Sequence, residues 1–219
     1  MKRVMQLAVA IAVAAIAIGG TQAVLATHTP ADKVVASGSK TQVLGPGDQV
    51  PILTATLKTS KPTDLILAVA MECSIFTRLV TGPSDQGGAD TATASGVVRA
   101  WVEIDGKIVP INSVSNPPQP PPAAGDDTDK VTFCNRTYSR TVTDAEDPLD
   151  GQDIEDDFID TKNANSFNWL RLNMGSGAHT IVVKATLTEA TNGDATAEAV
   201  IGNRSLIVEP EKLANDATI

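Results

Sequence analysis

A dense run of carboxylates is the feature of this sequence that most directly suggests chemistry. Residues 144–160 hold nine Asp and Glu side chains around Gly151. Hard cations such as Ca²⁺ take about six to eight oxygen ligands, often from flexible loops. The register differs from that of an EF-hand, because placing Gly151 at the turn puts Pro148 at a ligand position. We expect either a solvated loop or bound Ca²⁺, with the candidate ligands Asp144, Glu146, Asp147, Asp150, Asp153, Asp156 and Asp157.

Both tryptophans fall on the less apolar side of their expected strands. Trp101 shares parity with two charged residues, and Trp169 shares parity with Phe167 and Arg171. An outward aromatic side chain flanked by charges can stack on a sugar ring or anchor a partner. The pattern therefore indicates a ligand-binding set of Trp101, Phe167, Trp169 and Arg171. The alternative is that loops cover the indoles, or that a bulge shifts the register.

Support for catalysis is weak throughout the sequence. His28 and His179 are its two histidines, and no nucleophile motif or metal-ligand spacing accompanies them. A carboxylate pair could cleave a glycosidic bond, but spacing alone does not show two of them facing one substrate. The acidic balance argues against nucleic acid, since phosphate binding requires a basic patch. We expect a protein that is not an enzyme.

Two cysteines, Cys73 and Cys134, make up the thiol inventory. In an exported chain, an even pair of this kind indicates a disulfide. Closing the intervening loop stabilises a fold by roughly 4 kcal/mol in the chain-entropy model, which is an upper figure. Two separate buried thiols are the alternative.

The N-terminal residues predict export. Met1-Lys2-Arg3 precedes twelve residues, 7–18, that are all Ala, Val, Ile or Leu, and small or apolar residues lead to Ala26. These three regions define a secretory signal peptide. Twelve residues of helix span roughly 18 Å, short of the roughly 30 Å hydrocarbon core, so a retained anchor is the weaker alternative.

We therefore expect a signal peptide, 1–26, and a mature chain, 27–219, without an integral membrane anchor. Cleavage leaves 15 basic and 26 acidic residues, a net charge of −11. The expected location is secreted, either extracellular or in the periplasm or at the cell surface. The mature length suits a single domain with a sizeable core.

Strands are the elements that would position these residues. Period-2 alternation recurs along the mature chain and helix-period patterns are nearly absent. Turn signals such as Asp105-Gly106 and Asn192-Gly193 separate the alternating segments, and a bulge is expected around Gly202. The segments are 52–57, 65–73, 98–104, 107–109, 131–142, 170–174, 181–187 and 197–208. This pattern predicts an all-β fold, an antiparallel β-sandwich of seven to nine strands, immunoglobulin-like or jelly-roll.

One segment carries a local resemblance to known folds. Residues 172–183 resemble the strand–turn–strand corner common in immunoglobulin-like and jelly-roll sandwiches, which informs fold and not function. A Pro-rich loop, 116–129, and the acidic loop, 144–160, interrupt the strands.

Two functional hypotheses follow. The first is a secreted structural or adhesive β-sandwich that self-associates or binds a surface, with segments 27–43 and 209–219 able to lend a strand to a neighbouring subunit. The second is a secreted carbohydrate-binding module for an extracellular glycan, with Ca²⁺ in the acidic loop and the tryptophans as stacking residues.

Overall fold

The computed structural model describes residues 33–81, 89–111, 129–143 and 155–212, which form ten strands and no helix. The strands are β1 Val34–Gly38, β2 Gln42–Leu44, β3 Val50–Thr59, β4 Thr63–Thr81, β5 Ala89–Ile104, β6 Lys107–Ile108, β7 Val131–Thr143, β8 Glu155–Met174, β9 Gly177–Asn192 and β10 Asp194–Glu211. The all-β prediction is confirmed, and the prediction of seven to nine strands is wrong. The sequence analysis missed β1 and β2, which are five and three residues long.

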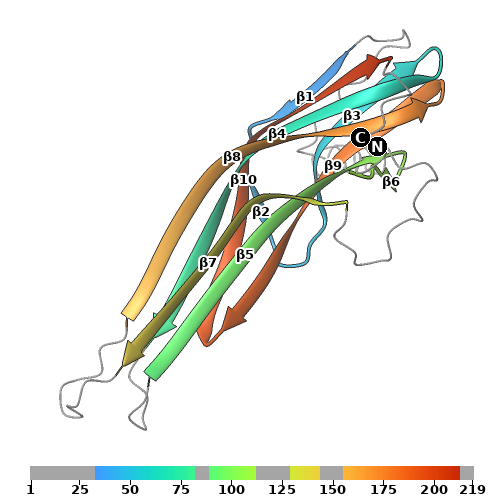
Figure 1. The fold of residues 1–219 in the computed structure, drawn as a ribbon. Coiled ribbons are helices and arrows are strands. Elements are labelled where there is room, and N and C mark those ends of the chain that lie inside the picture. Colours follow the sequence, from blue (N-terminus) through green and yellow to red (C-terminus); the bar gives the residue numbers. More distant parts are fainter. Residues whose placement is uncertain (1–32, 82–88, 112–128, 144–154, 213–219) are drawn as a thin grey trace, which may run out of the picture.

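Two antiparallel sheets pack together. We call the first the β4 sheet; its order is β1-β10-β4-β8, with β2 also paired to β10. The second, the β5 sheet, has the order β3-β9-β5-β6, with β7 also paired to β5. Long strands run most of the length of an elongated, curved molecule (Figure 1). No helix long and apolar enough to cross a membrane occurs in the described residues.

Several predicted segments fall where the structure gives no description. The signal peptide 1–26, residues 116–128 of the Pro-rich loop and residues 144–154 of the acidic loop lie outside the described residues. The described parts of the two terminal segments are paired within the chain. β1 and β2 pair with β10, and residues 209–211 of β10 pair with β4. The lending of a strand to a neighbouring subunit stays a prediction.

The core differs along the length of the molecule. One half, which we call the Leu67 half, is filled by large side chains that include Leu57, Leu67, Phe133 and Trp169. The other, the Leu79 half, has a separate small cluster of Leu79, Ala92 and Ala94, against which Tyr138 and Ala195 pack. Alternation on β4 places both leucines on one inward row, because successive side chains of a strand point to opposite faces.

The predicted bulge near Gly202 is confirmed. The pairing of β10 with β4 shifts register between Ile201 and Arg204. The shift turns Arg204 inward, where its Nε donates to the carbonyl of Ile52 at 2.8 Å and its Nη1 donates to the carbonyl of Lys40 at 2.8 Å. Burial lowers the pKa of the Arg204 guanidinium. This side chain joins β10 to both the opposite sheet and the segment between β1 and β2.

Candidate functional site

The predicted disulfide is present. Cys73 on β4 is bonded to Cys134 on β7, with their Cα atoms 6.4 Å apart. The two strands belong to different sheets, so the bond ties the sheets together between the Leu67 half and the Leu79 half.

The prediction that Trp101 is open to a ligand is wrong. Its parity does place it on the outer side of the β5 sheet, yet its side chain is 1% exposed. Lys130 Nζ lies 5.2 Å from the centre of the ring, and the indole Nε1 donates to Glu103 Oε1 at 2.9 Å. The indole is therefore buried, with the residue that precedes β7 packed over its ring, and it presents no free face to a sugar.

The prediction that Trp169 faces outward is also wrong, and a bulge explains why. Between the pairs Thr63–Met174 and Leu65–Arg171, β8 advances one residue more than β4, and Asn173 in this stretch has a positive φ of 53°. The extra residue reverses the parity of β8, so Trp169 lies opposite Leu67 in the core.

The other two residues of the predicted ligand-binding set, Phe167 and Arg171, lie on β8 with Trp169. Phe167 is half-buried and meets the Trp169 ring edge-on, with the ring centres 4.8 Å apart. Arg171 is half-buried on the same strand. Trp101 and Trp169 belong to different sheets, so the four residues do not form one exposed aromatic surface.

The predicted calcium ligands lie mostly outside the described residues. Asp144, Glu146, Asp147, Asp150 and Asp153 fall in 144–154, and only Asp156 and Asp157 are described. Both lie on β8, and each is paired with an arginine, Arg78 for Asp156 and Arg140 for Asp157. No group of three or more potential metal ligands occurs in the described parts of the chain. Calcium binding stays a prediction, which calorimetric titration of the mature chain with Ca²⁺ checks.

An exposed aromatic pair lies on the outer face of the β4 sheet, toward its Leu79 end. Phe158 on β8 is 63% exposed, and its ring stacks on that of Phe76 on β4, with centres 5.7 Å apart and planes 22° from parallel. Phe76 lies between Glu198 of β10 and Asp160 of β8 in the cross-strand register. We call these four residues, with Arg78, the Phe platform.

Arg78 stands in register with Phe158 and forms a two-pronged ion pair with Asp156. Its Nε and Nη2 donate to the two carboxylate oxygens at 2.8 and 2.7 Å. These hydrogen bonds lower the pKa of the Asp156 carboxyl and raise that of Arg78. The pair fixes the guanidinium beside the aromatic rings, since bidentate geometry orients both groups.

A polar depression adjoins the platform on the same face, beside the bulge of β10. Glu72 is its charged centre: Asn203 Nδ2 donates to Glu72 Oε2 at 3.0 Å, and Lys162 Nζ lies 3.4 Å from the same oxygen. The hydrogen bond from Lys162 lowers the pKa of Glu72. The walls are small or polar residues, and we call this feature the Glu72 depression; its lining is Ala70, Met71, Glu72, Ala164, Asn165, Ser166, Asn203, Arg204 and Ser205.

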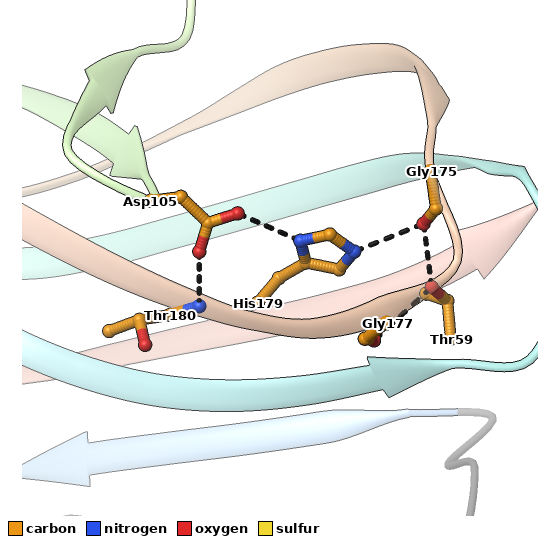
Figure 2. A network of polar contacts seen from close by, with 6 residues as sticks. All are labelled: Thr59, Asp105, Gly175, Gly177, His179 and Thr180. Atoms are coloured by element: carbon orange, nitrogen blue, oxygen red, sulfur yellow. Dashed lines mark hydrogen bonds and ion pairs between the residues drawn. The ribbon is translucent and has the colours of Figure 1, made fainter.

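A buried histidine organises the opposite end of the molecule (Figure 2). His179 Nδ1 lies 2.8 Å from Asp105 Oδ2, and its Nε2 lies 3.0 Å from the carbonyl of Gly175. Thr59 Oγ1 donates to that same carbonyl at 2.7 Å, and the amide of Thr180 donates to Asp105 Oδ1 at 2.8 Å. Both ring nitrogens face oxygen acceptors, so both contacts are hydrogen bonds only when each nitrogen carries a proton.

This network joins the β5–β6 turn, the β8–β9 turn and the end of β3. The turn at Asp105-Gly106 is the predicted hairpin, with positive φ at both residues and Ile104 paired with Lys107. Partial burial acts to raise the pKa of Asp105, but the hydrogen bonds from His179 and Thr180 outweigh it and the pKa is lowered. Every polar atom at the centre of the network is engaged in joining turns, which is a structural role.

The Phe platform was not predicted from the sequence, for two reasons. Phe158 lies within the acidic segment 144–160, which was expected to be a loop. Phe76 lies just beyond the predicted strand 65–73, whereas β4 continues to Thr81. Continued alternation was the available signal, because Phe76 shares parity with Glu72, Ser74 and Arg78 and not with the apolar row.

No protein-family model matches the chain, and no curated protein does. Among solved structures, the chain has a similarity to the structure of the infectious bursal disease virus Gx strain, with 9% sequence identity and a TM-score of 0.23. The match covers 86% of this chain and 40% of that chain, so the chain spans well under half the length of the viral one. A similarity of this size carries no argument about fold or function.

Proposed function

We propose that the chain is an exported, non-enzymatic structural or adhesive protein, a β-sandwich of immunoglobulin-like or jelly-roll type that self-associates. The signal-peptide pattern of residues 1–26 supports export, and a disulfide suits an oxidising compartment outside the cytoplasm. The His179–Asp105 pair is engaged in joining turns, which supports a role other than catalysis.

The observation that carries self-association is an apolar band on the outer face of the β4 sheet. Val35, Ile207 and Ala68 are aligned across β1, β10 and β4, and Ile66 and Leu170 are aligned in the next outward row. Val35 is 49% exposed and the other four side chains are half-buried. Apolar side chains gathered on one face of a sheet typically mark a contact surface.

A second copy of the chain is the partner that we propose for this band. Two such faces can stack with their side chains interlocked, as the inner faces of packed sheets do. Lys33 and Glu209 form an ion pair at the edge of the band, which would place a polar rim around an apolar centre.

Sedimentation of the mature, disulfide-bonded chain over a range of concentrations tests this proposal. We expect dimers or larger assemblies that Ala68→Lys converts to monomers, because the new charge would be buried at the contact. Thr93→Lys is the matched control, since it adds the same charge at a half-buried position on the outer face of the β5 sheet. A wild-type chain that is monomeric at every concentration would overturn self-association.

A further inference from the structure

We propose that the Phe platform and the Glu72 depression together bind a glycan chain that lies along the outer face of β4. The two features share one face and one strand, since Phe76, Arg78 and Glu72 are all outward residues of β4. Phe76 lies four positions after Glu72, a distance of about 13 Å along a strand, which suits a short oligosaccharide. The site lies on the same face as the apolar band but farther along β4, with its lining beginning at Ala70, two residues beyond Ala68.

The aromatic end of the site would hold a sugar ring by stacking. A pyranose presents C–H groups on one face, and these pack well against a flat aromatic ring. Phe158 offers such a ring with 63% of its surface exposed. Its stacking on Phe76 limits the directions that the ring can take, so less side-chain freedom is lost when a ligand binds.

The polar groups around the rings match a ligand that both donates and accepts hydrogen bonds. Asp160 and Glu198 flank Phe76 and can accept from hydroxyl groups, whereas Arg78 can donate to them. Carboxylates and cations alternate over this face, with Lys162 also outward on β8. A neutral polyhydroxyl ligand can use both kinds of group, whereas a charged peptide of either sign would meet like charges on this face, Arg78 and Lys162 or Asp160 and Glu198.

The Glu72 depression would receive the next part of the chain. Glu72 is held in place by Asn203 and Lys162, which leaves an ordered carboxylate at a site walled by small side chains such as Ala164 and Ser205. The bulge of β10 creates this room, because Gly202 faces Glu72 without a side chain: a Cβ there would lie 3.1 Å from Glu72 Oε2. The depression is therefore polar, shallow and accessible, as a site for a sugar chain must be.

Calorimetric titration of the mature, disulfide-bonded chain with soluble oligosaccharides tests the site. The panel should hold β-linked glucose, N-acetylglucosamine and xylose oligomers and α-linked mannose and glucose oligomers. We expect binding to at least one series, an affinity loss of tenfold or more for Phe158→Ala, a smaller loss for Glu72→Gln, and retained binding for Phe158→Trp. Ile108→Ala is the matched control, because Ile108 is 40% exposed and lies on β6, in the other sheet.

The outcomes separate the two proposals. If no member of the panel binds, or if Phe158→Ala binds as tightly as wild type while its melting temperature is unchanged, the glycan site is wrong. Binding of an oligolysine peptide without any glycan would also overturn it and would assign the face to a basic partner. Val35→Lys, which charges the side of the band on β1 that is farthest from β4, should give monomers and leave glycan affinity unchanged, and Phe158→Ala should leave the sedimentation unchanged.

Discussion

In the Leu67 half, Leu, Trp and Phe side chains fill the space between the sheets, whereas in the Leu79 half Ala, Gly and Thr line much of it. In the Leu79 half, where large apolar side chains are few, hydrogen bonds between polar side chains connect the two sheets. Arg136 Nε donates to Thr77 Oγ1 at 3.2 Å, and Tyr138 donates to Asp157 Oδ2 at 3.2 Å. On the outer face, hydroxyl pairs such as Thr93–Ser139, 2.8 Å apart, connect β5 to β7.

This contrast teaches that one pair of sheets can be held by two kinds of interaction. Burial of apolar surface stabilises in proportion to the area removed from water, about 25 cal/mol per Å². A hydrogen bond contributes a net of about 1 kcal/mol, because water satisfied the same groups before folding. The Leu67 half should therefore supply most of the folding free energy, and the Leu79 half should depend more on its hydrogen bonds and on the nearby disulfide.

The largest expected effect comes from truncating the same residue type in each half. Leu67 and Leu79 are both fully buried on one row of β4. We expect Leu67→Ala to lower the free energy of unfolding by about 4 kcal/mol and Leu79→Ala by about 2 kcal/mol, since fewer large neighbours surround Leu79. Urea denaturation measures both values. Equal losses would contradict the proposed difference between the halves.

Removal of the disulfide should have the next largest effect. We expect the double variant Cys73→Ala, Cys134→Ala to lose about 3 kcal/mol of stability. Hydrogen exchange followed by mass spectrometry should show the faster exchange concentrated in the Leu79 half, which has less apolar burial to compensate. A uniform increase along β4 and β5 would mean that both halves depend on the bond equally.

A methyl group added between the sheets tests how closely they approach where small residues begin. A Cβ at Gly96 would lie 3.0 Å from Ile75 Cγ2, closer than an ordinary contact. We expect Gly96→Ala to cost about 1–2 kcal/mol, because the sheets must separate slightly. Gly175→Ala is the control, since no atom lies within 4 Å of a Cβ built there. Thermal denaturation of the two variants gives the comparison.

The smallest loss of folding stability should come from replacing Asp105, which lies at the end of the Leu67 half. Its pKa is lowered in the folded protein, so its contribution is present above the unfolded value near 3.9 and is lost as pH falls through the folded value. We expect Asp105→Asn to cost about 1 kcal/mol at neutral pH. Asn also tolerates the positive φ of this turn, so the backbone should be preserved.

The pH dependence provides the readout for that variant. The stability difference between wild type and Asp105→Asn should shrink below about pH 4, as the Asp105 carboxylate becomes protonated. A difference that persists at pH 2 would indicate that the variant disturbs the turn itself and not the charge.

Local signals in the sequence predicted much of the fold. The Asp105-Gly106 hairpin and the bulge near Gly202 each depend on a few adjacent residues, and the disulfide was indicated by the cysteine pair and the expected export. The hairpin and the bulge have physical causes that act between neighbouring residues. The disulfide follows because an exported chain with two cysteines has one possible pairing within itself.

The candidate site could not be predicted in the same way. The parity of Trp169 reverses at an extra residue near Asn173, and Trp101 is covered by Lys130, which is 29 positions away in the sequence. Alternation reports which face a side chain is on, but it does not report what lies over that face. Phe158 was missed because the nearby carboxylates suggested a loop where the chain forms a strand.

The antiparallel pairing of β1 with β10 has a consequence for attachment. Val34, the first residue of β1, lies opposite Val208 near the end of β10, and Val208 in turn lies opposite Leu67 of β4. A surface that held the molecule by residues before β1 or after β10 would in either case hold the same end. Phe76 lies nine residues from Leu67 along β4, about 30 Å away. Tethering by either terminus would therefore place the Phe platform toward the far end of the molecule, about 30 Å from the attached end.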